Sequence, residues 1–386
     1  MITMYQQLCP VSFGSGAIAE IGVKANEFGA KNVLCIYDSG VKDSGVADRI
    51  IRYLEDSGMK VDTFDNVLPD APDTRINEIG TQINGKGYDL VVGIGGGSSM
   101  DTAKAISVLT DHPLPIQKYL ASSGVGPIRE NKTKLILVPT TAGTGSEVTM
   151  MSVIHNTKLH FKDAVLRPAD LAIVDPELTI TVPPAVTAAS ALDALSHAIE
   201  AYTSADSNPK ADLLALHAIK LIGNNIERAY NNGKDIDART ALCFASNIAG
   251  IAFSDASVHV GHCAAHELGL TFHISHGAAC AIATPATIEF CADILPQKIF
   301  NIAKALGCEV TPNDSSNVLG QKAATQVRLL MKKTGIKSLK EMGLTRNQVL
   351  SCAEGAIKNN WFYIKAPKEI DVNEMEILLG IMYDKY

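Results

Sequence analysis

Short apolar segments recur through the first half of the chain and alternate with stretches of helical composition. They are rich in valine, isoleucine and leucine and cover residues 32–37, 59–64, 88–94, 134–140 and 171–175. Strands that are buried on both faces are continuously apolar, and parallel strands need helical crossovers between them. We therefore predict a Rossmann-like α/β domain, in which a parallel sheet carries helices on both faces.

The pattern changes after Pro183 and Pro184. The pair itself marks the boundary, because two adjacent prolines end regular structure. Beyond this pair helical stretches follow one another, and strand-like runs almost vanish. These stretches cover residues 185–203, 210–230, 236–254, 257–268, 278–291, 294–306, 316–334 and 345–357. We predict an α/β nucleotide-binding domain over residues 1–183 and an all-α domain over residues 184–386.

Composition indicates a globular protein that binds neither nucleic acid nor a membrane. Hydrophobic residues make up 46% of the 386 residues and charged residues 19%. The net charge of −7, without any long basic run, disfavours contact with nucleic acid or an anionic membrane. No stretch reaches the ~18 apolar residues of a membrane span, and the first residues do not form a signal peptide. The eight cysteines are scattered, none in a Cys-x-x-Cys pair, so we expect reduced thiols in a cytoplasmic protein.

A glycine-rich segment, GIGGGSSMD at 93–101, follows one apolar run and precedes a helical stretch. Gly96 and Gly97 lack Cβ atoms, so a phosphate can approach the backbone closely. Ser98 is expected to cap the following helix, with Asp101 in the capping-box position. The free amides and the helix dipole then favour a phosphate, although glycine runs also form plain tight turns.

Two further features lie at predicted strand ends, where ligands bind in parallel sheets. The segment PTTAGTGSE at 139–147 brings there the hydroxyls of Thr140, Thr141 and Thr144. Asp38 directly follows the first apolar run. Its carboxylate can accept hydrogen bonds from an adenosine ribose and repel a 2′-phosphate, which favours NAD over NADP. The alternative is that Asp38 only begins a turn.

Acidic and imidazole side chains recur at helical spacing in the second half. Asp193 and His197 are four residues apart, as are His262 and His266, and His276 follows shortly after. Residues four apart share a helix face. One oxygen and three nitrogens suit Fe(II) or Zn(II) and can leave a position open for a substrate. The spacing does not determine which histidine lies outside the site.

At these segments the sequence resembles the iron-dependent (group III) alcohol dehydrogenase family. The resemblance covers nearly the whole chain and rests on GGGSSMDTAK (95–104), PTTAGTGSE (139–147), DPELT (175–179), DALSHAIEAY (193–202), GHCAAHELG (261–269) and HISHG (273–277). It implies a fold like that of dehydroquinate synthase, NAD as cofactor, and one divalent metal in a cleft between the domains. The implied metal is Fe(II), with Zn(II) as the alternative.

The resemblance also implies roles for individual residues. The implied metal ligands are Asp193, His197, His262 and His276, and the implied proton-relay residue is His266. The implied cofactor-binding residues are Asp38, Gly96, Gly97, Ser98, Thr140, Thr141, Thr144 and Lys162. Met151 and Phe253 fall where the family lines its substrate pocket. Glu200 is expected to make a structural hydrogen bond near the metal helix, and His273 is a candidate spare ligand. We interpret the other histidines as structural or surface residues: His112, His155, His160, His217 and His259.

The implied activity is hydride transfer between NAD and a primary alcohol or diol, or its aldehyde, in a homo-oligomer. One alternative is an NAD- and metal-dependent cyclising lyase of the dehydroquinate synthase type. Such a lyase needs several Lys and Arg for a phosphorylated substrate, and residues 257–277 contain none. The other alternative is a non-catalytic metal- or nucleotide-binding relative. It is disfavoured because every implied ligand and the relay histidine are present.

Overall fold

The computed structural model describes residues 5–159 and 161–386 and divides into two compact units. The sheet unit consists of Gln7–Thr141 with Gly145–Thr181. The helical unit consists of Val182–Tyr386 with Ala142–Thr144 and the described residues before Gln7. The turn at Ala142–Thr144 is therefore grouped with the helices that follow it, although it leaves a strand of the sheet unit.

Six parallel strands form the main sheet, in the order β1-β8-β5-β4-β2-β3. Strands β2, β4, β5 and β8 are buried along almost their whole length, which explains their continuously apolar sequences. The predicted parallel sheet is confirmed. The strands are β1 Val11–Phe13, β2 Asn32–Ile36, β3 Lys60–Phe64, β4 Leu90–Gly95, β5 Lys134–Pro139 and β8 Leu171–Val174.

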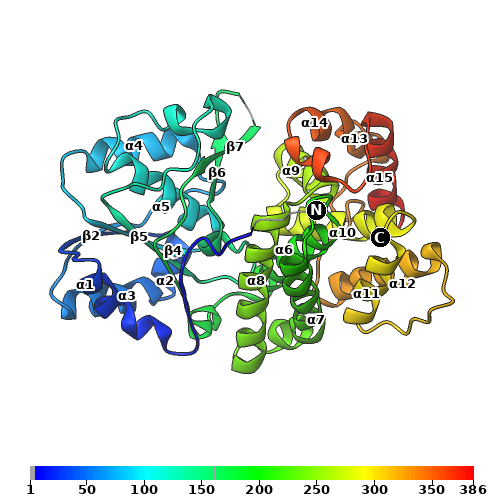
Figure 1. Cartoon of the computed structure of the whole chain (residues 1–386), viewed down its shortest axis with the longest axis horizontal. Coiled ribbons are helices and arrows are strands. Elements are labelled where there is room, and N and C mark those ends of the chain that lie inside the picture. Colours follow the sequence, from blue (N-terminus) through cyan, green and yellow to red (C-terminus); the bar gives the residue numbers. More distant parts are fainter. Residues whose placement is uncertain (1–4, 160) are drawn as a thin grey trace. The chain divides into compact units, whose positions relative to one another are not determined.

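Helices cover both faces of this sheet (Figure 1). Helices α1 (Ile21–Glu27) and α3 (Val46–Asp56) lie on one face, and α4 (Asp73–Ile83) and α5 (Gly97–Leu109) lie on the other. The short helix α2 (Ser39–Asp43) follows β2. This arrangement places the start of α5 directly after β4, so the glycine-rich segment lies at the carboxyl end of a central strand.

A second, antiparallel sheet in this unit pairs β6 (Met151–Asn156) with β7 (Phe161–Leu166). The sequence did not predict this hairpin. Burial alternates along β6, but two of its buried side chains are polar, Ser152 and Asn156. The Ser152 hydroxyl donates to the Asp101 carbonyl at 2.7 Å, which satisfies it in the interior. Alternating burial with polar residues on the buried face leaves no hydrophobic pattern to detect.

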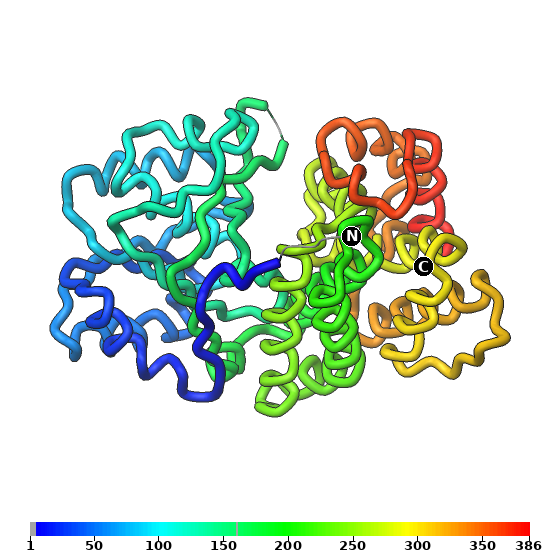
Figure 2. Tube along the Cα trace, in the orientation of Figure 1, coloured from blue at the N-terminus to red at the C-terminus, as the bar shows by residue number. Residues whose placement is uncertain are grey.

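The helical unit is built around α6 (Pro184–Thr203), which packs against α7, α8 and α10. Every residue of α6 from Ala191 to Thr203 is buried. The predicted all-α architecture is confirmed, and Figure 2 traces it from the green α6 to the red α15. The other helices are α7 Pro209–Asn231, α8 Ile236–Ala256, α9 Val260–Phe272, α10 His276–Ala292, α11 Pro296–Ala305, α12 Ser316–Lys333, α13 Arg346–Leu350, α14 Ala353–Lys358 and α15 Val372–Asp384.

A fully buried lysine joins α5 to the segment that leads into β6. The ammonium of Lys104 donates to Ser146 Oγ at 2.8 Å, to Thr149 Oγ1 at 3.3 Å and to the Met151 carbonyl at 2.6 Å. It also lies 3.6 Å from the carboxylate of Asp101, one turn earlier on α5. A buried charge is tolerated only when it is paired and hydrogen-bonded, and this network meets both conditions.

We predict that Lys104→Met destabilises the protein by about 3 kcal/mol, because it leaves the buried Asp101 without its cation. Denaturant unfolding measures the free energy. The control is Lys24→Met, since Lys24 pairs with Glu27 at the surface and its loss should change stability by less than about 0.5 kcal/mol. Equal effects of the two substitutions would contradict a stabilising role for this network.

Candidate functional site

Two of the expected metal ligands lie on the most buried helix of the helical unit. Asp193 and His197 are one turn apart on α6, with side chains 3% and 7% exposed, and Asp193 Oδ1 lies 4.0 Å from His197 Nε2. Asp193 Oδ1 has no hydrogen-bond partner among the described residues. A buried carboxylate oxygen without a donor is costly, so this atom is suited to a cation.

Two more expected ligands come from α9 and α10. His262 lies in the first turn of α9 and is buried, while His276 is the first residue of α10 and is 30% exposed at its side chain. A Cβ at Gly277 would lie 2.4 Å from the Ala189 carbonyl oxygen of α6. This close approach of α10 to α6 requires glycine, and it brings His276 Nε2 to 3.4 Å from Asp193 Oδ1.

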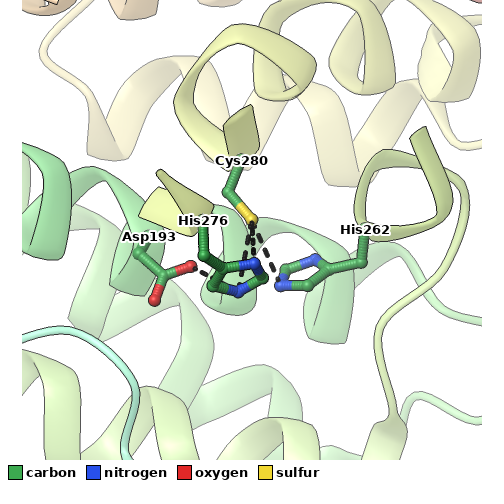
Figure 3. Close-up of side chains that lie close together, drawn as sticks. All are labelled: Asp193, His262, His276 and Cys280. Atoms are coloured by element: carbon green, nitrogen blue, oxygen red, sulfur yellow. Dashed lines mark hydrogen bonds and ion pairs between the residues drawn. The ribbon is translucent and has the colours of Figure 1, made fainter. Parts of the chain in front are cut away.

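The side chains of Asp193, His262 and His276 converge with that of Cys280 (Figure 3). One ligand atom each from Asp193, His262, His276 and Cys280 lies within 4.8 Å of the other three. Cys280 Sγ is 3.6 Å from His276 Nε2 and 3.7 Å from His262 Nε2. The sequence analysis missed Cys280. Its position four residues after His276 on the same helix was the available signal, since residues at this spacing share a face.

His197 is not one of these four residues, but it lies directly beside them. Its ring stacks on that of His262, with centroids 4.7 Å apart, and on that of Phe253 at 4.4 Å. Its Nδ1 has no hydrogen-bond partner among the described residues. Burial lowers the pKa of His197 to about 4, so its imidazole is neutral near pH 7, the form that binds a metal.

Glu200 orients His262 through the ring nitrogen Nδ1, while Nε2 of the same ring lies near Cys280. Its Oε1 accepts a hydrogen bond from His262 Nδ1 at 2.6 Å, and its Oε2 accepts from the backbone amide of His259. The expected structural hydrogen bond of Glu200 is confirmed. Burial alone would raise the pKa of Glu200, but the charge and hydrogen bond of His262 outweigh it and lower the pKa to about 2. Glu200 holds the Nδ1–H of His262, so Nε2 is the nitrogen at which a metal would replace the second ring proton.

The donor set fits a divalent first-row metal. It combines a buried carboxylate oxygen without a donor, two imidazole nitrogens and a thiol, with a second carboxylate behind His262. Such mixed oxygen, nitrogen and sulfur donors are typical of Fe(II) and Zn(II) sites, and the carboxylate behind an imidazole is a common supporting interaction.

His266, the expected relay residue, lies one turn after His262 on α9 and close to the group. Its ring centroid is 5.3 Å from that of His276 and 5.8 Å from that of Phe362. Its Nδ1 lies 2.9 Å from Oδ1 of the buried Asn360. Because an amide oxygen only accepts, Nδ1 carries the proton in this contact and Nε2 is left as an acceptor. Asn360 was not predicted from the sequence.

The start of α5 differs from the prediction in its capping. The helix begins at Gly97, its N-cap is Gly96, and among the described residues no side chain caps it. The predicted capping box of Ser98 and Asp101 is therefore wrong. Ser98 is already inside the helix, where its hydroxyl accepts from the Asp70 amide at 3.1 Å, and Asp101 is held by Ser146 at 2.7 Å. An uncapped helix start leaves backbone amides that can bind an anion.

Asp38 and Gly95 lie next to the start of α5. Asp38 is the N-cap of α2, and its Oδ1 accepts from the Val41 amide at 3.0 Å. Its Oδ2 accepts from Ser99 Oγ at 2.9 Å. The turn-starting role of Asp38 is confirmed, while the ribose contact stays a prediction. Gly95 has φ 145° and brings its Cα against Ser99, a conformation that favours glycine.

Asp70 connects Lys162 to the start of α5. Lys162 lies on β7, and its ammonium pairs with Asp70 Oδ1 at 2.9 Å. The backbone amide of Asp70 in turn donates to Ser98. Asp70 has φ 60°, and the sequence analysis did not identify it. The structure thus links Lys162 to the glycine-rich segment within one unit.

The remaining expected site residues divide between the two units. Thr140 and Thr141 follow β5 in the sheet unit, where Thr141 Oγ1 lies against Gly96. Thr144 belongs to the helical unit. Met151 begins β6 in the sheet unit, and Phe253 lies on α8 in the helical unit.

The histidines outside the group have other environments. His273 ends α9 with φ 56° and is not among the four grouped residues. His259 is fully buried, and its Nε2 lies 2.8 Å from Thr203 Oγ1. His160 lies outside the described residues.

Across the described residues, no single helix has both the length and the apolar character needed to span a membrane. Helices α8 and α9 meet these criteria only as a pair, with a bend of 109° between them.

We predict that Glu200→Gln weakens metal binding by roughly 10–100-fold, because an amide no longer provides the negative acceptor that holds His262. Competition with a coloured chelator measures the affinity for Zn(II). The matched control is Glu227→Gln, since Glu227 pairs with Lys333 at the surface and should not affect the affinity. Unchanged affinity in both variants would show that Glu200 does not support the metal.

Comparisons with known proteins agree with this geometry. The family model described as "Iron-containing alcohol dehydrogenase" matches residues 10–176, and the one described as "Fe-containing alcohol dehydrogenase family, C-terminal" matches residues 187–383. Long-chain-alcohol dehydrogenase 1 of Geobacillus thermodenitrificans is 39% identical over 76% of this chain and 75% of its own length. NAD-dependent methanol dehydrogenase of Bacillus methanolicus is 32% identical over 90% and 91%. A crystal structure of 1,3-propanediol oxidoreductase is 31% identical and superposes with a TM-score of 0.91 over 98% of this chain and all of that one.

Proposed function

The chain belongs to the iron-containing alcohol dehydrogenase family, and from this premise we propose that it transfers a hydride between a primary alcohol or diol and NAD. The reaction converts the alcohol and NAD⁺ into the aldehyde, NADH and a proton. The observation that carries the proposal is the convergence of Asp193, His262 and His276, in which Asp193 Oδ1 has no hydrogen-bond donor among the described residues.

We propose Asp193, His197, His262 and His276 as the residues that hold the metal, with Fe(II) as the ion and Zn(II) as the alternative. When bound, a divalent metal polarises the substrate oxygen as a Lewis acid, while NAD accepts the hydride. Glu200 keeps His262 in the tautomer that presents Nε2. Phe253, stacked on His197, provides an apolar wall that limits access of water.

His266 is proposed to carry the alcohol proton away. Asn360 accepts a hydrogen bond from its Nδ1–H, so in the neutral ring Nε2 is the nitrogen that can accept a proton. Phe362 packs against the edge of the ring and restricts its rotation. The pair His266 and Asn360 thus holds a proton acceptor in one orientation beside the metal residues.

NAD is proposed to bind at the start of α5. The uncapped amides after Gly96 would hold the pyrophosphate, and the positive end of the helix dipole adds to this attraction. Lys162 would contribute an ammonium donor nearby, since Asp70, its ion-pair partner, donates its backbone amide to Ser98. Asp38 retains acceptor capacity on both oxygens for the ribose hydroxyls, because each carboxylate oxygen has two lone pairs. Thr140, Thr141 and Thr144 are proposed as further cofactor contacts.

The proposed substrates are uncharged primary alcohols. These relatives are named for long-chain alcohols, methanol and 1,3-propanediol, all of which carry a terminal hydroxyl group and which differ in length. Met151 of the sheet unit and Phe253 of the helical unit are proposed as substrate contacts, each taken by itself. Both side chains are apolar, and apolar side chains bind a carbon chain by burial rather than by charge.

We predict that metal removal abolishes NADH formation and that anaerobic reloading with Fe(II) or Zn(II) restores it. The assay follows NADH and NADPH with methanol, longer primary alcohols and 1,3-propanediol, with Mg(II) as a control ion that these donors bind poorly. Full activity in metal-free protein would overturn the proposal. Bound metal and bound NAD without reduction of either cofactor would favour the cyclising lyase or the non-catalytic alternative.

We predict that Asp38→Ser shifts cofactor preference toward NADP. Serine is also a favourable N-cap, so α2 keeps its cap while the negative charge that repels a 2′-phosphate is lost. The ratio of kcat/KM for NADP to that for NAD should rise by about tenfold, equivalent to about 1.4 kcal/mol. Asp43→Ser at the other end of α2 is the control. The same ratio in both variants would exclude Asp38 as the residue that selects NAD.

A further inference from the structure

We propose that Asp65 is a second residue that selects NAD over NADP, because its carboxylate holds Lys42, a cation that would otherwise be available to a 2′-phosphate. The inference rests on the proposed function, since it assumes that NAD binds at the start of α5 with its adenosine ribose at Asp38. It adds two residues that neither the motifs nor the resemblance identified.

The order of the strands gives the direction in which a bound adenosine extends. Strand β4 leads into the start of α5, β2 ends shortly before Asp38, and β3 is the outer neighbour of β2. Ile36 of β2 pairs with Phe64 of β3 in parallel register, so Asp38 and Asp65 follow strands that end at the same edge of the sheet. A cofactor with its pyrophosphate after β4 and its ribose after β2 therefore extends toward the end of β3.

Lys42 connects the expected ribose position with the end of β3. The Lys42 amide donates to the Asp38 carbonyl at 3.2 Å, which closes the first turn of α2. Residues four apart share a helix face, so the Lys42 side chain lies on the same side of α2 as Asp38. Its ammonium donates to Asp65 Oδ2, directly after β3. The cation is therefore close to Asp38 but paired with another carboxylate.

The charges at this edge disfavour a 2′-phosphate twice. The hydrogen bond from Lys42 holds the pKa of the Asp65 carboxyl below its usual value, so Asp65 is ionised near pH 7. Its negative charge adds to that of Asp38. Nucleotide-binding sheets that accept NADP place a cation near the 2′-phosphate, and here that cation already has a partner. The side chains of Lys42 and Asp65 are 56% and 39% exposed, so a bound nucleotide can reach both.

Arg75, a second cation near the end of β3, is held by other groups. Its guanidinium lies over the Phe64 ring, 4.9 Å from the centroid. It also donates to the Asn66 carbonyl at 3.3 Å and to Glu78 at 2.8 Å. Substitution of Asp65 leaves these contacts in place and releases the ammonium of Lys42. Lys42 is therefore the cation that a change at Asp65 makes available.

Equilibrium binding of NAD and NADP to the full-length protein tests the proposal without turnover. Isothermal titration calorimetry gives the Kd of each cofactor. Asp65→Asn keeps the size of the side chain and removes its charge, so the Kd of NADP relative to that of NAD should fall by about fivefold. The double variant Lys42→Met/Asp65→Asn should lose this gain, because the released ammonium is then absent. The ratio of kcat/KM for the two cofactors should change in the same direction.

The matched control is Asp43→Asn. Asp43 follows Lys42 on α2, and its substitution removes the same charge without breaking the ion pair. Its ratio of Kd values should equal that of the unsubstituted protein. An equal gain in Asp43→Asn, or a gain that persists in the double variant, would show that net charge alone matters and would overturn the role of Lys42. If Asp65→Asn fails to fold by circular dichroism, Asp65→Ser replaces it.

The remaining outcomes separate this inference from the proposed function. If NAD binds and Asp38→Ser shifts the preference while Asp65→Asn does not, the inference is overturned and the proposed function stands. If the unsubstituted protein binds neither NAD nor NADP, the proposed cofactor site is wrong and the inference fails with it.

Discussion

The candidate metal centre depends on the hydrogen bonds that the buried carboxylate of Glu200 accepts from His259 and His262. Glu200 lies on α6, seven residues after Asp193, and it binds both the backbone and the ring of the first turn of α9. One charge therefore joins two helices and sets the orientation of His262. A Cβ at Gly261 would lie 2.7 Å from Glu200 Oε1, so glycine is required for this contact. With α9 fixed on α6, only α10 is needed to complete the group.

In the sheet unit a buried cation, the ammonium of Lys104, connects the elements. Lys104 ties α5 to the segment from Ser146 to Met151, while the start of the same helix is left without a side-chain cap. The helix is thus anchored at its middle and open at its first turn. This combination suits an anion site, because the amides that would bind the anion are held in place without being used by the protein itself.

Much of the fold and part of the candidate metal site could be predicted from the sequence. Apolar runs identified the parallel sheet, and the spacing of Asp193 and His197 placed both on one face of a helix. The spacing of four residues from His276 was the one signal for Cys280, since a cysteine in an alanine-rich helix otherwise has the character of a small core residue. Ser98 was misplaced because the helix starts two residues earlier than the capping pattern suggests, with Gly96 at the cap. Asp70 and Asn360 act through contacts with residues distant in sequence, which no local pattern encodes.

The central claim is that Asp193, His262 and His276 bind one divalent metal. The most direct measurement is anomalous X-ray diffraction at the metal absorption edge, from crystals of protein loaded with Fe(II) or Zn(II). The account predicts one strong peak within bonding distance of Asp193 Oδ1 and the Nε2 atoms of both histidines. A loaded crystal with its peak elsewhere, or with none between these three side chains, would contradict it.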